Sequence, residues 1–146
     1  MVNRIWDPEN RYTEGFLKEF KHWIWEVSYR QHTLGSFIIF AKRPVKKLSD
    51  LAAEELSSLG KVLKEVEKTF AKIKAFKPDW FNYWQMGNSL PHLHIHGFPR
   101  YKKPRFFAGK KWVDKTWGHP PIWSKKDVSH KLVAKIRKEI KKHIRK

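Results

Sequence analysis

The 146-residue chain is predicted to fold as one domain that mixes β-strands with α-helices. Three observations support this fold class. Two short apolar stretches, 23–27 and 37–41, flank a glycine turn and have the pattern of strands. Apolar residues from Leu51 to Ile73 then recur at three- and four-residue spacing, which is typical of a helix. A second helical stripe, 128–144, follows near the end of the chain.

The first half of the chain is predicted to form a hairpin followed by a long helix. In the stretch 23–27 apolar bulk surrounds one acid, Glu26, and after the turn at 33–36 the stretch 37–41 is predicted to be a buried strand. Ser49 or Asp50 is expected to cap the long helix, and Pro78 is expected to end it. The apolar stripe of this helix is predicted to be core.

The second half is predicted to add two strands and a final helix. The stretch 80–85 is a third strand, and 86–91 turns it into a strand that carries three histidines. Residues 102–126 are rich in Pro, Gly, Trp and Lys and are expected to be irregular. The stripe 128–144 is a C-terminal helix. No repeat and no linker divides the chain, so 1–146 is treated as one domain.

The composition excludes several classes of protein. No apolar run approaches the length of a membrane span, and residues 1–7 do not resemble a signal peptide. The chain has no cysteine, so it has no disulfide, no thiolate nucleophile and no thiolate metal site. We therefore expect a cytoplasmic protein with no membrane partner.

The charge balance favours anionic partners. Lys and Arg number 32 against 14 Asp and Glu, a formal net charge of +18. The cations are concentrated in two blocks, 100–105 and 131–146. Such surfaces attract nucleotides, polyphosphates, nucleic acid or acidic membrane surfaces, and we expect weak, salt-sensitive binding of nucleic acid or another polyanion.

Three histidines alternate with apolar residues between Pro91 and Gly97. Because successive side chains of a strand point to opposite faces, His92, His94 and His96 are predicted to share one face. Leu93 and Ile95 would then enter the core. Imidazole can attack, donate or accept a proton near neutral pH, so this segment is the candidate site of chemistry.

Three interpretations of the histidines stay open on spacing alone. They could bind zinc with an open fourth position, although no Asp or Glu lies nearby in the sequence as a supporting partner. They could be incidental surface residues. They could also supply a nucleophile, since neighbouring cations disfavour protonation of His94. In that case the backbone N–H groups of Gly87, Asn88 and Ser89, in the preceding turn, could hold phosphate oxygens.

The segment 92–98, His-Leu-His-Ile-His-Gly-Phe, resembles the motif of the histidine triad (HIT) family. Segments 34–45, 48–56, 87–91 and 99–100 resemble, in the same order, its glycine turn and strand, helix start, phosphate loop and motif exit. The resemblance covers residues 23–101, and 102–146 is a basic extension outside it.

The resemblance implies an α+β fold with an antiparallel sheet, usually as a homodimer. It implies nucleotidyl hydrolases or transferases that act on nucleoside phosphates, dinucleoside polyphosphates or nucleotide conjugates. Because the chain has no Cys and no carboxylate near the histidines, we expect no cofactor and no metal. In that family the residue at the position of His94 attacks the α-phosphorus and forms a covalent nucleotidyl-histidine. His96 would contact the phosphate and leaving group, and His92 would support the site by hydrogen bonding.

The resemblance also implies a set of substrate-binding residues, with some departures. Asn88 and Ser89 lie in the same loop as Gly87 and match family positions that contact phosphate oxygens. Asn82 matches a polar position that faces the nucleotide. Ser28 stands where a ribose-contacting asparagine is common. Many members have glutamine at the position of Asn88 and histidine at that of Ser36. We expect phosphorus chemistry to survive these changes, with an altered nucleoside preference.

Two alternatives from other classes are a nucleic-acid-binding module, acting on adenylated ends, and a histidine-based metal-binding protein. His119 is a candidate for a site wall. The other histidines are expected at the surface or its boundary, namely His22, His32, His130 and His143. Trp112, Trp117 and Trp123 are expected to pack in the core or in a dimer interface.

Overall fold

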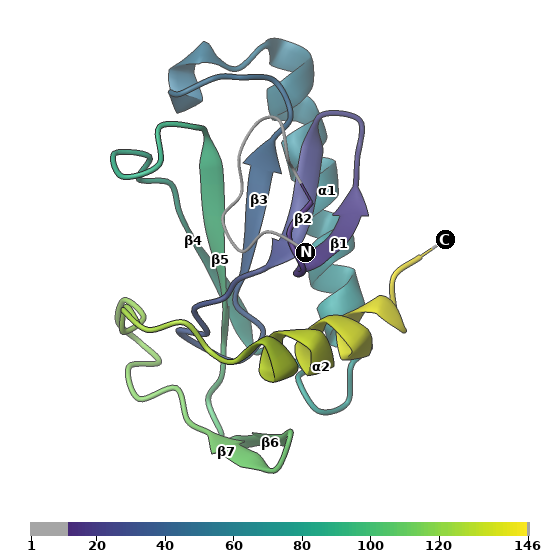
Figure 1. Ribbon diagram of the computed structural model, residues 1–146, viewed down its shortest axis with the longest axis vertical. Helices are drawn as coiled ribbons and strands as arrows, with labels where there is room; N and C mark the ends of the chain where they lie inside the picture. The colour runs from purple at the N-terminus through teal and green to yellow at the C-terminus, as the bar shows by residue number, and fades with distance from the viewer. Residues whose placement is uncertain (1–11, 146) are drawn as a thin grey trace.

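An antiparallel sheet of five strands forms the centre of the computed structural model, which describes residues 12–145 (Figure 1). The strand order is β1-β2-β3-β5-β4, and every neighbouring pair is antiparallel. The strands are β1 Phe16–Glu19, β2 Trp23–Val27, β3 Phe37–Ala41, β4 Trp80–Trp84 and β5 His94–Arg100. This sheet confirms the predicted α+β fold. Residues 1–7, where no signal peptide is expected, and the last residue of the basic block lie outside the described residues.

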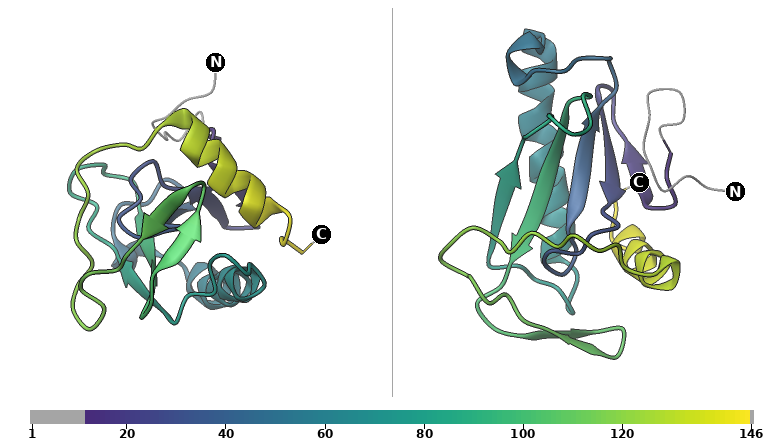
Figure 2. Two further views of the ribbon diagram at one scale, coloured as in Figure 1. Left: turned by 90° about the horizontal axis from the view of Figure 1, so that it is seen from below. Right: turned by 60° about the vertical axis from the view of Figure 1, so that its left-hand side comes forward.

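Two α-helices cover the sheet on one side and at one end. The long helix α1, Ala53–Ala71, runs along one face of the sheet, and α2, His130–Lys141, crosses near β1 and β2 (Figure 2). A short 3-10 helix, Leu48–Asp50, precedes α1. No helix within residues 12–145 combines the length and apolarity that crossing a membrane requires. The face of the sheet opposite α1 carries the histidines.

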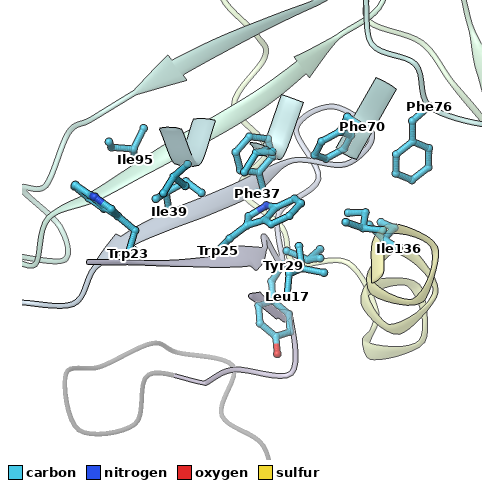
Figure 3. Close-up of a cluster of buried hydrophobic side chains, with 14 of the residues drawn as sticks. Leu17, Trp23, Trp25, Tyr29, Phe37, Ile39, Phe70, Phe76, Ile95 and Ile136 are labelled. Carbon is cyan, nitrogen blue, oxygen red and sulfur yellow. The ribbon is translucent and has the colours of Figure 1, made fainter. Parts of the chain in front are cut away.

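The core lies between the sheet, α1 and α2, and its central side chains are drawn in Figure 3. Alternation along β2 sends Trp23, Trp25 and Val27 into this core and Ile24 to the opposite face. Gly97 of β5 lies over the ring of Phe37, where a Cβ would come within 2.2 Å of ring carbons. Only glycine therefore allows the two central strands to pack here.

The predicted ends of the long helix are wrong at both sides. Ser49 and Asp50 belong to the 3-10 helix, and the N-cap of α1 is Ala52. Glu55, inside the first turn, accepts the N–H of Ala52 at 2.8 Å and so replaces a side chain at the cap. At the other end α1 stops at Ala71, before Pro78, because the following turns return Ile73 and other apolar residues to the core.

The structure also corrects the predicted strands. β1 was not predicted, β4 ends one residue earlier than expected, and β5 begins at His94, so His92 lies before the strand. The region 102–126 contains a hairpin of β6, Arg105–Phe107, and β7, Lys110–Trp112. Ala108 and Gly109 connect these strands with φ of 54° and 69°, as a tight hairpin turn requires. Three-residue strands are too short to show a periodic pattern.

The C-terminal helix is shorter than its apolar stripe. The Ser129 hydroxyl accepts the N–H of Leu132 at 3.1 Å and caps α2. Val133, Ile136 and Ile140 of α2 are fully buried, and Val128 and Ile144 pack against the core from outside the helix. The basic extension thus shares the hydrophobic core of the sheet.

Candidate active site

The second and third histidines of the motif lie side by side on the open face of the sheet. Leu93 and Ile95 are buried in the core, which turns His94 and His96 to the opposite face. Their ring centroids lie 4.9 Å apart at 78°. In the register of the central strands, His94 is opposite Phe40 and His96 is opposite Ile38.

His94 is oriented by a backbone carbonyl. Its Nδ1 lies 2.7 Å from the carbonyl oxygen of His92. Because a carbonyl only accepts, this contact assigns the proton to Nδ1 and leaves the lone pair on Nε2. The ring also stacks on Phe40, with centroids 5.7 Å apart. The ring therefore has a defined orientation, and its Nε2 is available as a nucleophile.

His92 supports the site from the segment that enters β5. Its Nε2 donates to the carbonyl oxygen of Ala41 at 2.6 Å, and burial lowers the pKa of its ring. The expectation that His92 belongs to the histidine strand is wrong, because β5 begins at His94. Within residues 12–145, no three His, Asp or Glu side chains converge on a position that could hold one metal ion.

His96 is half-buried and lies beside the indole of Trp123. Burial, followed by the charges of His94, His32 and Arg30, lowers the pKa of His96 to about 3. The ring is therefore neutral at physiological pH. Its buried Nδ1 has no hydrogen-bond partner within residues 12–145. A neutral imidazole in this position offers an N–H donor rather than a positive charge.

A cavity of about 140 Å³ adjoins His94. Ser28, which is predicted to bind substrate, is buried just after β2 and lines this cavity, and so does Leu90. The remaining lining residues are Thr13, Glu26, Val27, Tyr29, Ile38 and Phe40. Burial raises the pKa of Glu26 to about 7, against hydrogen bonds from Thr13 that act in the opposite direction.

The predicted phosphate loop lies between β4 and β5. Gly87 adopts a φ of 75°, which allows the turn, and the side chains of Asn88 and Ser89 are exposed. None of these three residues lines the cavity beside His94, where the loop contributes Leu90. Their position is accessible to a phosphate that approaches from solvent.

Asn82 belongs to a second, more open cavity of about 500 Å³. Its Oδ1 accepts from Arg100 Nη1 at 2.7 Å, so the predicted nucleotide contact competes with an internal hydrogen bond. Arg100 is itself buried and forms a two-point ion pair with Asp114. This cavity is lined by Trp80, Asn82, Tyr83, Trp84, Trp117, Gly118, His119, Pro120 and Pro121.

Sequence reasoning missed two residues beside His96. His32 is half-buried, at the boundary as expected, but Trp123 stacks on it with ring centroids 4.2 Å apart. The Trp123 ring lies edge-on to His96 at 5.0 Å. Burial, with the charge of Arg30, lowers the pKa of His32 to about 4, and its Nδ1 accepts the N–H of Ser124 at 2.8 Å. No local pattern marks either residue, because they come from distant segments.

Comparison with models of known protein families identifies the family of this chain. The model of the HIT domain matches residues 28–103, about half of the chain. The chain belongs to the HIT family. The three motif histidines, His92, His94 and His96, lie within the matched residues. No curated protein matches this HIT protein.

Solved structures share the HIT fold at low sequence identity. A histidine triad nucleotide-binding protein of Sulfolobus tokodaii is 19% identical, with a TM-score of 0.67 over 89% of this chain and 83% of that one. A zinc-bound histidine triad protein of Mycobacterium smegmatis is 13% identical, with a TM-score of 0.67 and coverage of 94% and 88%. The diadenosine triphosphate hydrolase of Plasmodium falciparum is 14% identical, with a TM-score of 0.66 and coverage of 91% and 78%.

Proposed function

We propose that this HIT protein is a nucleotidyl hydrolase or transferase in which Nε2 of His94 attacks the α-phosphorus of a nucleotide. The observation that carries the proposal is the hydrogen bond from His94 Nδ1 to the carbonyl oxygen of His92. It leaves the Nε2 lone pair available, and it prepares the ring for the positive charge that appears when Nε2 bonds to phosphorus.

The reaction proceeds in two displacements. In the first, the Nε2–phosphorus bond forms as the bond from phosphorus to the leaving group breaks, and the leaving group departs with the electron pair. His94 is then a cationic nucleotidyl-imidazole whose Nδ1–H still donates to His92. In the second, water or inorganic phosphate attacks phosphorus, loses a proton to solvent and restores neutral His94. The products are a nucleoside monophosphate or diphosphate, respectively.

His96 assists the leaving group in this scheme. Because its pKa is lowered to about 3, it is neutral and acts through an N–H hydrogen bond. The bond stabilises negative charge on the departing atom or positions a water that protonates it. His92 holds the approach to β5 through the carbonyl of Ala41.

Relatives support the reaction class, and two departures bear on the substrate. The solved structures with this fold include a diadenosine triphosphate hydrolase and a uridylyltransferase. At the first departure, Ser36 is buried and donates to the carbonyl oxygen of Thr33 at 2.8 Å, so it serves the turn. At the second, Ser28 lines the cavity with a shorter side chain than asparagine. These features favour conserved phosphorus chemistry with a distinct nucleoside preference.

The proposal is tested by incubating the purified protein with nucleoside phosphoramidates and dinucleoside polyphosphates and identifying products by mass spectrometry. We expect monophosphate in water and additional diphosphate if inorganic phosphate is the acceptor. His94→Ala is the matched control, because it removes the nucleophile and leaves the cavity. Product formation no faster than with His94→Ala, for every substrate, would contradict the proposal. The homodimer and the cytoplasmic location stay predictions, of which light scattering on the purified protein tests the first.

A further inference from the structure

Glu26 is a buried acid on the same side of the sheet as the triad. It lies in the middle of β2, opposite Ile38, and Ile38 in turn lies opposite His96 of β5. Only 1% of Glu26 is exposed. Carboxylates are rarely buried to this degree without full pairing, so the residue calls for an explanation.

Half of the Glu26 carboxyl group is partnered within the protein. Oε1 accepts from the hydroxyl of Thr13 and from its N–H at 3.3 Å. Oε2 is buried and has no hydrogen-bond partner within residues 12–145. An unpaired buried acceptor costs free energy that a ligand with a suitable donor would recover.

Glu26 lines the same cavity as His94. The walls beside it are apolar or aromatic, with Ile38 and Phe40 on β3 and Leu90 on the loop. Such walls suit the flat apolar faces of a nucleobase, and a volume of about 140 Å³ is of the order of one base. If His94 attacks an α-phosphorus, the attached nucleoside must lie within reach of this cavity.

We propose that Glu26 determines base specificity by accepting N–H hydrogen bonds from the base, and that this selects guanine nucleotides. The proposal rests on the nucleotidyl-transfer function proposed above. Guanine presents two adjacent donors, N1–H and the 2-amino group, on one edge. Adenine places the acceptor N1 beside its amino group, and uracil flanks its N3–H with carbonyl oxygens. A carboxylate can therefore accept both hydrogen bonds from guanine. It would repel N1 of adenine and the carbonyl oxygens of uracil, which are themselves acceptors.

Thr13 is the positioning residue for this contact. Its two donors both engage Oε1, which holds the carboxyl plane and leaves the two lone pairs of Oε2 for the two donors of the guanine edge. They also favour the ionised carboxylate that accepts from guanine, although burial raises the pKa of Glu26 to about 7. Donation from the base would stabilise the ionised form further.

The first experiment compares guanosine, inosine and adenosine 5′-phosphoramidates that share one leaving group. Wild type should prefer guanosine to inosine, which lacks the 2-amino group, and inosine to adenosine. Glu26→Gln should lower kcat/KM for guanosine by about ten- to a hundredfold, the range for a hydrogen bond to a charged group, with little change for adenosine. Glu139→Gln, on α2, is the matched control for loss of one acid.

The guanosine-to-adenosine ratio measured in each variant does not depend on the fraction of protein that is folded. An equal ratio in wild type and Glu26→Gln would overturn the proposal, as would a wild type that prefers adenosine. A second experiment separates this from failure of the proposed function. Calorimetry with His94→Ala, which cannot turn over, should show tighter binding of guanosine monophosphate than of adenosine monophosphate. Adding Glu26→Gln should remove the difference, and equal affinities before that change would refute the assignment even without any turnover.

Discussion

Trp123 stacks on His32 with a centroid distance of 4.2 Å and an interplanar angle of 23°, which joins the basic extension to the turn before β3. The same indole lies edge-on to His96. The basic extension therefore places a side chain directly beside His96, although the family model matches only residues 28–103. His32 keeps this wall in place through the N–H of Ser124.

The first prediction concerns Trp123 as a positioning residue. Trp123→Ala should slow turnover most for poor leaving groups, because the loosened His96 ring no longer directs its hydrogen bond. An activated ester, which departs without such help, should recover much of the lost rate. Trp117→Ala, which removes an indole from the other cavity, is the control. Equal losses on both esters, or equal losses in both variants, would show that Trp123 only stabilises the fold.

The second prediction divides labour between His94 and His96. His94→Ala should abolish turnover of every substrate, because no other group provides the nucleophile. His96→Ala should lose about 10²–10⁴-fold on poor leaving groups and regain much of this on activated esters. In quenched reactions of His96→Ala, peptide mass spectrometry should find the nucleotidyl adduct on His94. Rescue of His94→Ala by the activated ester, or an adduct elsewhere, would reverse the assignment.

The third prediction concerns stability and the pKa of Glu26, which is raised from 4.5 to about 7 in the folded state. Between these values the folded protein binds more protons than the unfolded chain, so the contribution of Glu26 to stability falls as pH rises and is constant above about 7. The fall amounts to about 3 kcal/mol. Glu26→Gln does not titrate, so its free energy of unfolding should rise relative to wild type across this window. Urea titrations at the two ends of the window measure the change, and a constant difference would contradict it.

The fourth prediction concerns the buried ion pair of Arg100 and Asp114, whose side chains are 1% and 2% exposed. Burial alone would raise the pKa of Asp114, but hydrogen bonds from Arg100 and two backbone N–H groups outweigh it and lower the pKa. Asp114→Asn leaves Arg100 without its counter-charge and should cost about 3–5 kcal/mol in urea unfolding.

The exposed pair of Arg30 and Asp127 is the control for this change. Asp127→Asn should cost less than about 1 kcal/mol, since solvent screens the pair. The stabilisation from Asp114 should be present above the unfolded pKa of 3.8 and should be lost as pH falls below it. Similar costs for the two substitutions would show that the buried pair does not anchor the extension.

The fifth prediction concerns the basic surface of α2. Lys131, Lys135 and Lys138 are exposed there, whereas Lys141 donates to the carbonyl oxygen of Leu17. Replacing the first three by Gln should reduce retention on a polyanion resin and weaken its salt dependence, because fewer counterions are released. Turnover of a small nucleotide should not change. Turnover that collapses in a folded triple variant would show that α2 builds the active site.

Local patterns in the sequence determined the framework of this HIT protein. Alternation in 93–96 was sufficient to place His94 and His96 on one face of a strand, since the core takes Leu93 and Ile95 on the other. Periodicity also located both helices, although not their ends. Helix ends depend on caps such as Glu55 at Ala52 and on which later residues return to the core.

Only the tertiary structure decided what surrounds the triad. It removed His92 from the strand by pairing it with Ala41, and it brought Trp123 and His32 to His96. In the sequence, Glu26 is one acid among apolar residues. In the structure it is a buried hydrogen-bond acceptor in the cavity that His94 also lines. Periodicity reports which face of one element a side chain takes. Contacts, burial and pKa shifts arise where elements distant in sequence meet, and these depend on the packing of the whole chain.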